Sequence, residues 1–284
     1  IGVRAVQRPE MQPGSFHQEE SFAINYGGGT WSSSFNTSFS GSRVRFSQTP
    51  GAFIEFDLAQ GSSGFVAYMT RFNTGAPLRV CYKPKTSGDP VCSVVQENVS
   101  LFNSATQFTY GFPFVGLPTD QAYTVRIEHA GTGSQHISFD AIAVLGVPDQ
   151  LLAAGGGRID DTHPALLFSP GVWQSFAWSG YYGGSQSFAL NAGAVMHLRM
   201  DGSDLTLIQR VSRFSTRNVD ICIVTQDSIL PSRVTCTAFS QYLPGGDTPQ
   251  IPISFYDLGT GILDVYIINR DPDRMLSIDA VQID

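Results

Sequence analysis

The histidines and serines of this chain do not have the spacings of known catalytic motifs. The chain has five histidines, at His17, His129, His136, His163 and His197, and no pair of them forms an HExxH or H-x-x-x-H motif. Serines are abundant, yet no G-x-S-x-G sequence places one on the sharp turn of a nucleophile elbow. We therefore expect a protein that is not an enzyme and requires no cofactor.

The four cysteines fall into two pairs, Cys81 with Cys92 and Cys222 with Cys236. Each pair flanks a turn sequence, CYKPKTSGDPVC in one case and CIVTQDSILPSRVTC in the other. Zinc is the rival interpretation, but CxxC spacing and supporting histidines are absent. The sequence predicts one disulfide across each of two β-hairpins, and such disulfides persist in oxidising, extracellular compartments.

Aromatic residues are the candidates for ligand or interface contacts. Trp178, Tyr181 and Tyr182 lie in the glycine-rich segment WSGYYGG. An exposed Trp or Tyr stacks its flat face against a sugar ring, and it serves equally well in a protein interface. In the segment FTYGFPF (108–114), alternation places Tyr110 and Phe112 on one face with two phenylalanines. That face belongs either to an edge of the core or to a ligand platform.

The chain contains an internal repeat that must position these groups. Residues 29–72 and 171–214 align without a gap, with identity at nine of 44 positions, including the dipeptide Arg-Phe at the end of each stretch. The cysteine pairs and the endings SFDAIAV (138–144) and SIDAVQI (277–283) also correspond. A repeat of this length is a whole domain. We expect an N-terminal arm (1–15), a first domain (16–146, repeat 1), a linker (147–158) and a second domain (159–284, repeat 2).

Positions that are aromatic in both repeats are expected to form the core. These pairs are Trp31 with Trp173, Phe39 with Tyr181, Phe46 with Phe188, and Phe72 with Phe214.

Alternation of apolar and polar residues dominates both repeats. The segments IEFDL (54–58) and MHLRM (196–200) have the same register, which places the histidine of the second segment on the face that points to solvent. Turn clusters rich in glycine separate many short segments of this kind, and no helical stripe is sustained. The sequence predicts an all-β protein with two tandem antiparallel β-sandwich (jelly-roll) domains.

The segment DDTHPALLFSPGVW (160–173), the GAVMHLRM strand and the terminal SIDAVQI resemble galactose-binding-like jelly rolls. These include the carbohydrate-binding modules of bacterial extracellular surface proteins. The resemblance implies two opposed antiparallel sheets and allows sugar recognition. Repeat 1 departs from it at its opening, where HQEESFAINYGGGTW replaces the DD-x-x-PA pattern.

The same resemblance implies a structural Ca²⁺, because in these modules acidic residues of the first and last strands often meet around one. A hard cation takes six to eight oxygens, which carboxylates and loop carbonyls supply. The alternative is that these carboxylates cap turns or lie in solvent. The candidates are Glu19, Glu20 and Asp140 in repeat 1, and Asp160, Asp161 and Asp279 in repeat 2.

Composition limits the classes of partner. The net charge is −7 with only two lysines, which argues against nucleic-acid binding. Only 14% of residues are charged, against about 25% in ordinary domains. The resulting neutral polar surface suits sugar contacts or close subunit packing. No apolar run is long enough to span a membrane, and the opening IGVRAVQRPE lacks the apolar stretch of a signal peptide, so we expect a mature or trimmed chain.

The sequence thus predicts a non-enzymatic extracellular surface protein that mediates adhesion, carbohydrate binding or self-assembly. The alternative is a structural subunit of a filament or surface layer. In that case the alternating residues Ile1, Val3 and Ala5 of the arm add as a strand to a neighbouring subunit. A third possibility is an accessory pair of domains from a larger enzyme.

Overall fold

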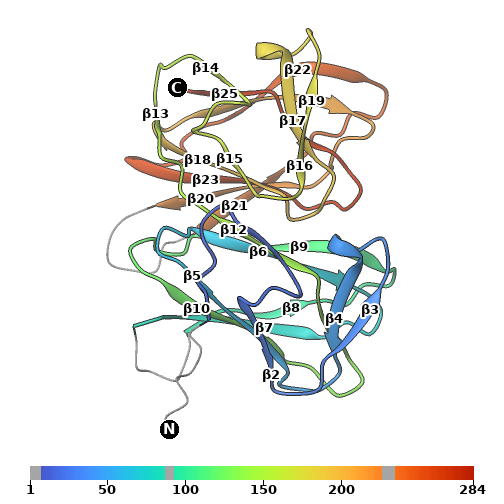
Figure 1. Ribbon diagram of the computed structural model, residues 1–284. Helices are drawn as coiled ribbons and strands as arrows, with labels where there is room; N and C mark the ends of the chain where they lie inside the picture. The colour runs from blue at the N-terminus through green and yellow to red at the C-terminus, as the bar shows by residue number, and fades with distance from the viewer. Residues whose placement is uncertain (1–7, 87–92, 226–233) are drawn as a thin grey trace. The chain divides into compact units, whose positions relative to one another are not determined.

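A computed structural model describes residues 8–86, 93–225 and 234–284 of the chain. Every regular element in these ranges is a β-strand, apart from two short 3-10 turns (Figure 1). None of the helical turns found there has the length and apolar character that crossing a bilayer requires. The prediction of an all-β protein is confirmed.

Repeat 1 is built from three sheets, with strand orders β2-β5-β10-β7-β8, β1-β12-β6-β9 and β11-β4-β3. The strands are β1 (Phe16–Gln18), β2 (Ile24–Gly27), β3 (Ser32–Phe35), β4 (Arg43–Ser47), β5 (Phe53–Leu58), β6 (Gly64–Arg71), β7 (Pro77–Pro84), β8 (Ser93–Ser100), β9 (Gln107–Val115), β10 (Tyr123–His129), β11 (Ile137–Phe139) and β12 (Ala141–Leu145).

Repeat 2 has the same strand order in its own three sheets: β18-β23-β20-β21 with β13 and β15 beside β18, β14-β25-β19-β22, and β16-β17-β24. Its strands are β13 (Leu151–Ala153), β14 (Arg158–Asp160), β15 (Leu167–Phe168), β16 (Trp173–Ala177), β17 (Ser185–Ala189), β18 (Val195–Asp201), β19 (Leu205–Ser212), β20 (Val219–Thr225), β21 (Val234–Phe239), β22 (Asp247–Phe255), β23 (Ile262–Asn269), β24 (Leu276–Ile278) and β25 (Ala280–Ile283).

The core of repeat 2 lies between its two larger sheets. Met196 and Leu198 of β18 pack with Ile221 of β20 on one side, and Leu207 of β19 and Val281 of β25 belong to the same cluster. Alternate residues of each strand point to the same face, so the period-two pattern fills this core from both sheets.

The predicted arm and linker both contain residues that join a sheet. In the range 1–15, Met11 is fully buried and donates its N–H to the carbonyl of Asp57. In the range 147–158, β13 pairs in parallel with β18, with Leu152 opposite Met200. Two compact units are distinguished in the chain, and the second begins its long continuous stretch at Leu145. The exact boundaries stay a prediction.

The two repeats do not keep a constant offset along the gap-free alignment. The last residues of β10 and β23 donate to the carbonyls of Ala52 and Ala194, which are 142 positions apart. The aspartates of SFDAIAV and SIDAVQI donate to the carbonyls of Tyr68 and Ile208, which are 140 positions apart. The turn between β5 and β6 is therefore two residues longer than the turn between β18 and β19.

This shift means that the two Arg-Phe dipeptides are not structurally equivalent. Phe72 donates its N–H to the carbonyl of Leu101, whereas Phe214 lies in a turn with 60% of its surface exposed under the guanidinium of Arg213. The expectation that Phe214 belongs to the core is wrong. The gap-free alignment matches the two Arg-Phe dipeptides because it ignores the two extra residues in the turn of repeat 1.

The disulfide predicted in repeat 2 is present. Cys222 of β20 and Cys236 of β21 lie opposite each other in the ladder and their sulfur atoms are bonded. Cys81 is buried on β7, but Cys92 lies outside the described residues. The pairing of Cys81 with Cys92 therefore stays a prediction.

His197 is buried, which corrects the expectation of a solvated side chain. Its Nδ1 lies 2.9 Å from the carbonyl of Gly146, and its Nε2 lies 2.9 Å from the carboxylate of Asp264. The ring stacks on Tyr266 with centroids 4.1 Å apart. Alternation correctly gave the face of the strand, but it could not show that this face is covered.

Candidate functional site

An aromatic surface forms in repeat 2 where β16 runs into the turn at 178–184. Trp178 and Phe176 each expose 49% of their surface, and Tyr182 is also exposed. Tyr181 is buried, and its ring meets Trp178 edge-to-face at 5.1 Å and Phe176 at 6.4 Å. Tyr181 therefore packs against the two exposed rings from the buried side, and its predicted role in ligand contact stays a prediction.

The backbone of the turn fixes the orientation of Trp178. A Cβ added at Gly180 would lie 2.6 Å from the indole, so the ring rests directly on the glycine backbone. The N–H of Trp178 donates to the carbonyl of Gly184 at 2.9 Å, and Gln250 Nε2 donates to the carbonyl of Gly180 at 2.8 Å. A tryptophan held in this way loses little side-chain freedom when it binds a ligand.

Polar groups lie around this aromatic surface. Arg210 Nη1 is 3.5 Å from the hydroxyl of Tyr181, and the same guanidinium donates to both carboxylate oxygens of Asp247. These hydrogen bonds from Arg210 hold the pKa of Asp247 below its usual range. The hydroxyl of Tyr182 donates to the carbonyl of Arg158 at 3.3 Å. Apolar ring faces thus stand near ionised and amide groups.

Repeat 1 lacks this aromatic surface. Ser34, Asn36 and Ser40 occupy the aligned positions of its two exposed rings and of Tyr182. Phe39, which corresponds to Tyr181, packs instead against Phe108 with centroids 5.3 Å apart.

The alternation expected along β9 does not continue through its whole length. Thr109 has a positive φ of 49°, which interrupts the regular pleat beside Phe108. Tyr110 and Phe112 are half-buried, and Phe114 is buried against Phe65 with centroids 4.8 Å apart. The structure therefore places Tyr110 and Phe112 at the edge of the packed region and not on an exposed platform.

The carboxylates of repeat 1 divide into a buried pair and an exposed residue. Asp140 is fully buried, and its Oδ2 accepts from the N–H of Ser40 at 3.1 Å and the hydroxyl of Thr109 at 2.9 Å. The N–H of Glu19 donates to the carbonyl of Asp140 at 2.9 Å. Glu20 is exposed and forms an ion pair with Arg43. Glu19 and Asp140 come together, and Glu20 faces away.

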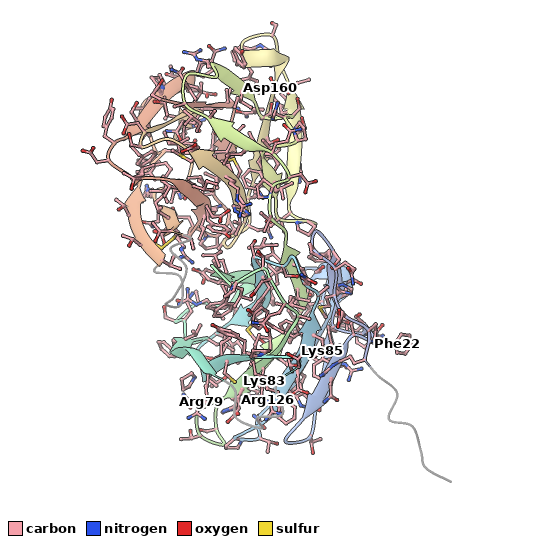
Figure 2. All side chains as sticks on the ribbon, turned by 90° about the vertical axis from the view of Figure 1, so that its left-hand side faces the viewer. Phe22, Arg79, Lys83, Lys85, Arg126 and Asp160 are labelled. Atoms are coloured by element: carbon pink, nitrogen blue, oxygen red, sulfur yellow. A yellow bond between two sulfur atoms is a disulfide. The ribbon has the colours of Figure 1, made fainter. Side chains whose placement is uncertain are left out.

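Repeat 2 reproduces this arrangement with different acids. The N–H of Asp161 donates to the carbonyl of Asp279, whose Oδ1 accepts from the N–H of Tyr182 at 2.8 Å. Asp161 also accepts from the hydroxyls of Ser185 and Ser187, at 2.9 and 2.7 Å. Asp160, labelled in Figure 2, lies close beside the turn that follows Tyr182.

Burial leaves several of these carboxylate oxygens without a partner. They are Glu19 Oε2 and Asp140 Oδ1 in repeat 1, and Asp160 Oδ2 and Asp279 Oδ2 in repeat 2. Burial also raises the pKa of Asp140 to about 7 and that of Asp279 to about 6. Two orphaned oxygens per repeat fit a hard cation. Within the described ranges no three acidic, histidine or cysteine residues gather as a metal-binding group, so carbonyls, hydroxyls or water would complete the coordination.

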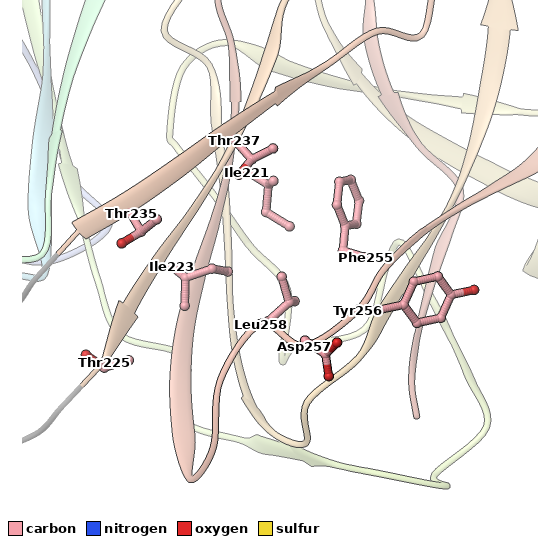
Figure 3. Close-up of a pocket in the computed structure, with 9 residues that line it drawn as sticks. All are labelled: Ile221, Ile223, Thr225, Thr235, Thr237, Phe255, Tyr256, Asp257 and Leu258. Carbon is pink, nitrogen blue, oxygen red and sulfur yellow. The ribbon is translucent and has the colours of Figure 1, made fainter.

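Two features of the surface were missed by sequence reasoning. Phe22 exposes 95% of its surface and projects away from repeat 1 (Figure 2). It borders a shallow cavity of about 590 Å³. Phe22 follows Glu-Glu-Ser in a turn, where no periodicity distinguishes an exposed ring from a buried one. The second missed feature is a cleft in repeat 2 (Figure 3), lined partly by apolar core residues.

No protein-family model matches the chain, and no curated protein matches it either. Among solved structures, a Paenibacillus xanthan lyase is 12% identical with a TM-score of 0.36, covering 99% of this chain. This chain spans only 27% of that lyase. A carbohydrate-binding module from Clostridium stercorarium, solved with cellobiose, is 12% identical with a TM-score of 0.31, over 48% of this chain and 97% of the module.

A fucolectin from striped bass serum is 9% identical with a TM-score of 0.26, over 90% of this chain and 96% of the lectin. At these identities and scores no residue role is transferred to this chain. The geometry alone defines antiparallel β-sandwich architecture in both repeats, with an exposed aromatic surface around Trp178 in repeat 2.

Proposed function

We propose that this chain is a non-catalytic pair of extracellular β-sandwich modules that binds carbohydrate through the aromatic surface of repeat 2. The observation that supports this most is Trp178, half-exposed on a glycine backbone and braced by the buried ring of Tyr181. The Cys222–Cys236 disulfide supports an oxidising, extracellular location.

The chemistry of the surface matches what a sugar ring offers. The C–H face of a pyranose is apolar and stacks on an indole, while its hydroxyls need donors and acceptors at the edge. Asp247 and Arg210 supply a carboxylate and a guanidinium near the rings, and Tyr182 supplies an aromatic face. A neutral glycan suits this site, because the guanidinium and the carboxylate already neutralise each other.

The test is a glycan array probed with the whole chain and with Trp178→Ala. We expect signals that the substitution reduces by about tenfold, since stacking a ring contributes roughly 1–2 kcal/mol. Phe35→Ala is the matched control, because Phe35 is an exposed ring in repeat 1. An array without signals, or signals that Phe35→Ala reduces as strongly as Trp178→Ala, would reject the proposal for this site.

We also propose that each repeat holds a structural calcium ion. In repeat 1 its carboxylate ligands are Glu19 and Asp140, and in repeat 2 they are Asp160 and Asp279, with the orphaned oxygens described above. Calcium at 100 times its Kd would add about 2.7 kcal/mol to the stability of a repeat. EDTA should therefore lower the melting temperature and added calcium should restore it. An unchanged melting temperature in EDTA contradicts the proposal.

Self-association is a second candidate, favoured by the edge strand β21. Among the described strands β21 pairs with β20 alone, and its residues from Val234 to Ala238 are exposed. An unpaired edge accepts an added strand, and residues 1–6 alternate suitably. Deleting residues 1–7 spares the buried Met11 and tests this directly. Polymers seen by electron microscopy should disappear on deletion, and a full chain that stays monomeric contradicts this candidate.

A further inference from the structure

Repeat 2 contains a cleft of about 420 Å³ at the β20–β21 edge of its sandwich (Figure 3). Ile221 and Ile223 form one wall, and Phe255 and Leu258 at the end of β22 form the other. Thr235, on the exposed strand β21, lies at the rim with a neighbouring threonine. The apolar core thus reaches the surface between β20 and the residues around Phe255, with two threonines of the edge strand at the rim.

Repeat 1 has two tyrosines at the ladder positions that correspond to this part of repeat 2. Tyr82 lies opposite Val125 in the ladder, as Ile223 lies opposite Val265. By the same register, Leu263 takes the place of Tyr123. The rings of Tyr82 and Tyr123 pack edge-to-face with centroids 5.2 Å apart. At these two positions repeat 2 has aliphatic side chains in place of phenol rings, and one of the two, Ile223, lines the cleft.

The mouth of the cleft carries a carboxylate in an unusual backbone conformation. Asp257 has a φ of 56°, and the equivalent residue of repeat 1 is Gly116, with a φ of 83°. The N–H of Asp257 donates to Asp204 Oδ1 at 3.0 Å, which brings a second carboxylate close. No ion pair found among the described residues involves either aspartate. A φ of 56° lies in the left-handed region, which aspartate adopts more readily than most residues and glycine adopts without steric cost.

Tyr256, the preceding residue, also lines the cleft and exposes 70% of its surface. An aromatic face next to a carboxylate favours a cation over an anion or a neutral group. The cleft volume falls within the roughly 300–1,000 Å³ typical of small-molecule sites, which combine apolar walls with a few polar groups.

We propose that this cleft binds a small amphipathic molecule with one ring-sized apolar body and a protonated amine. The body lies between Ile223 and Phe255. The amine meets the carboxylate of Asp257 and the ring of Tyr256 at the mouth. The site is separate from the aromatic surface around Trp178 and does not depend on carbohydrate binding there.

The experiment uses 2-phenylethylamine as the probe and 2-phenylethanol as its neutral counterpart, with the full chain observed by amide NMR. We expect the amine to shift the amide signals of Thr235 and Leu258 and to bind more tightly than the alcohol. Thr237→Tyr changes an exposed residue, so it spares the core while filling the cleft from its rim. It should weaken amine binding by about tenfold or more, because the new phenol ring occupies the apolar space in which the ring of the probe would be buried.

Asp257→Asn tests the head group, because asparagine tolerates the same backbone conformation without the charge. It should reduce the preference for the amine by about fivefold, the value of an exposed ion pair. Trp178→Ala should leave both probes unaffected. The proposal is overturned if neither probe binds, if the alcohol binds as tightly as the amine, or if Thr237→Tyr binds like the unsubstituted chain. Self-association that Thr237→Tyr abolishes would assign the cleft to a second copy and would equally overturn it.

Discussion

Glu55 in repeat 1 and His197 in repeat 2 occupy the same place on the outer face of the same sheet, and their surroundings differ. Glu55 lies opposite Arg126, and the two form an ion pair at 2.7 Å that remains partly in solvent. His197 lies opposite Tyr266 and is buried against Asp264. The same strand position therefore carries a partly solvated ion pair in repeat 1 and a buried polar network in repeat 2.

The same contrast holds for the candidate sites. Backbone hydrogen bonds from Glu19 and Asp161 to the last strand are conserved between the repeats, although the acids differ in length. The side chains of Trp178 and Ile223 are not repeated, because repeat 1 has Asn36 and Tyr82 at those positions. The shared contacts maintain the sandwich, and the unshared side chains create the surfaces that could bind.

The largest expected difference between the repeats follows from removing one acid from each. Asp264→Ala should destabilise repeat 2 by about 4 kcal/mol, because it leaves the buried His197 and the partly buried Arg199 without their shared partner. Glu55→Ala should cost repeat 1 about 1 kcal/mol, because its ion pairs are partly hydrated. Thermal unfolding of both variants measures this. Equal losses would contradict the contrast between buried and solvated networks.

The same residue gives repeat 2 an acid sensitivity. Burial raises the pKa of Asp264, but hydrogen bonds and charge from His197 and Arg199 outweigh burial and lower it overall. A carboxylate whose pKa is lower in the folded state than in the unfolded state stabilises the fold when the pH is above its unfolded-state pKa. This stabilisation is lost as the pH falls through the folded-state pKa. Asp264→Asn should therefore lose less stability than the unsubstituted chain between pH 5 and pH 2.

The Cys222–Cys236 bond gives the next largest effect. Replacing both cysteines with alanine should destabilise repeat 2 by about 3 kcal/mol, the loop-closure value for about 15 residues. Differential scanning calorimetry should show one transition moving while the transition of repeat 1 stays. A reduced chain that melts like the oxidised chain would show that the ladder alone holds this hairpin.

The fold was predictable because a two-residue period, glycine-rich turns and a long internal repeat all indicate the same architecture. The errors arose where tertiary context decides. Alternation placed His197 on the outer face but carried no sign of the Gly146 carbonyl and Tyr266 ring that cover it. The turn between β18 and β19 is two residues shorter than its counterpart, so the two Arg-Phe dipeptides align in sequence but not in structure. The prediction that Phe214 belongs to the core rests on that alignment, and it is wrong.

The candidate site was predictable only in part. The sequence analysis selected Trp178 as an aromatic residue in a glycine-rich segment, and the structure exposes 49% of its surface. Tyr181, its neighbour in the sequence, supports the indole from below, a distinction that needs coordinates. The cleft leaves no motif in the sequence, because nothing in the chain marks Ile223 as the smaller counterpart of Tyr82.

Exchanging the tyrosine and aliphatic side chains between the two repeats tests the origin of the cleft. Tyr82→Ile combined with Tyr123→Leu should open a cavity in repeat 1 and destabilise it by about 2 kcal/mol. Ile223→Tyr in repeat 2 should change stability by less than about 1 kcal/mol, because the ring enters an existing space. Denaturant unfolding reports both values. A large loss on Ile223→Tyr would mean that the cleft does not accommodate a ring as the first repeat does.

The smallest expected effect concerns the backbone at the mouth of the cleft. Asp257→Gly should stabilise repeat 2 by about 0.5 kcal/mol, because glycine adopts a φ of 56° without steric cost, as Gly116 does at 83° in repeat 1. The gain is small because glycine also gives the unfolded chain more freedom. Asp257→Asn is the control that removes the charge but keeps the conformational preference, and it should leave stability unchanged. If both variants stabilise repeat 2 equally, Asp257 destabilises the fold through repulsion between its carboxylate and that of Asp204, and not through backbone strain.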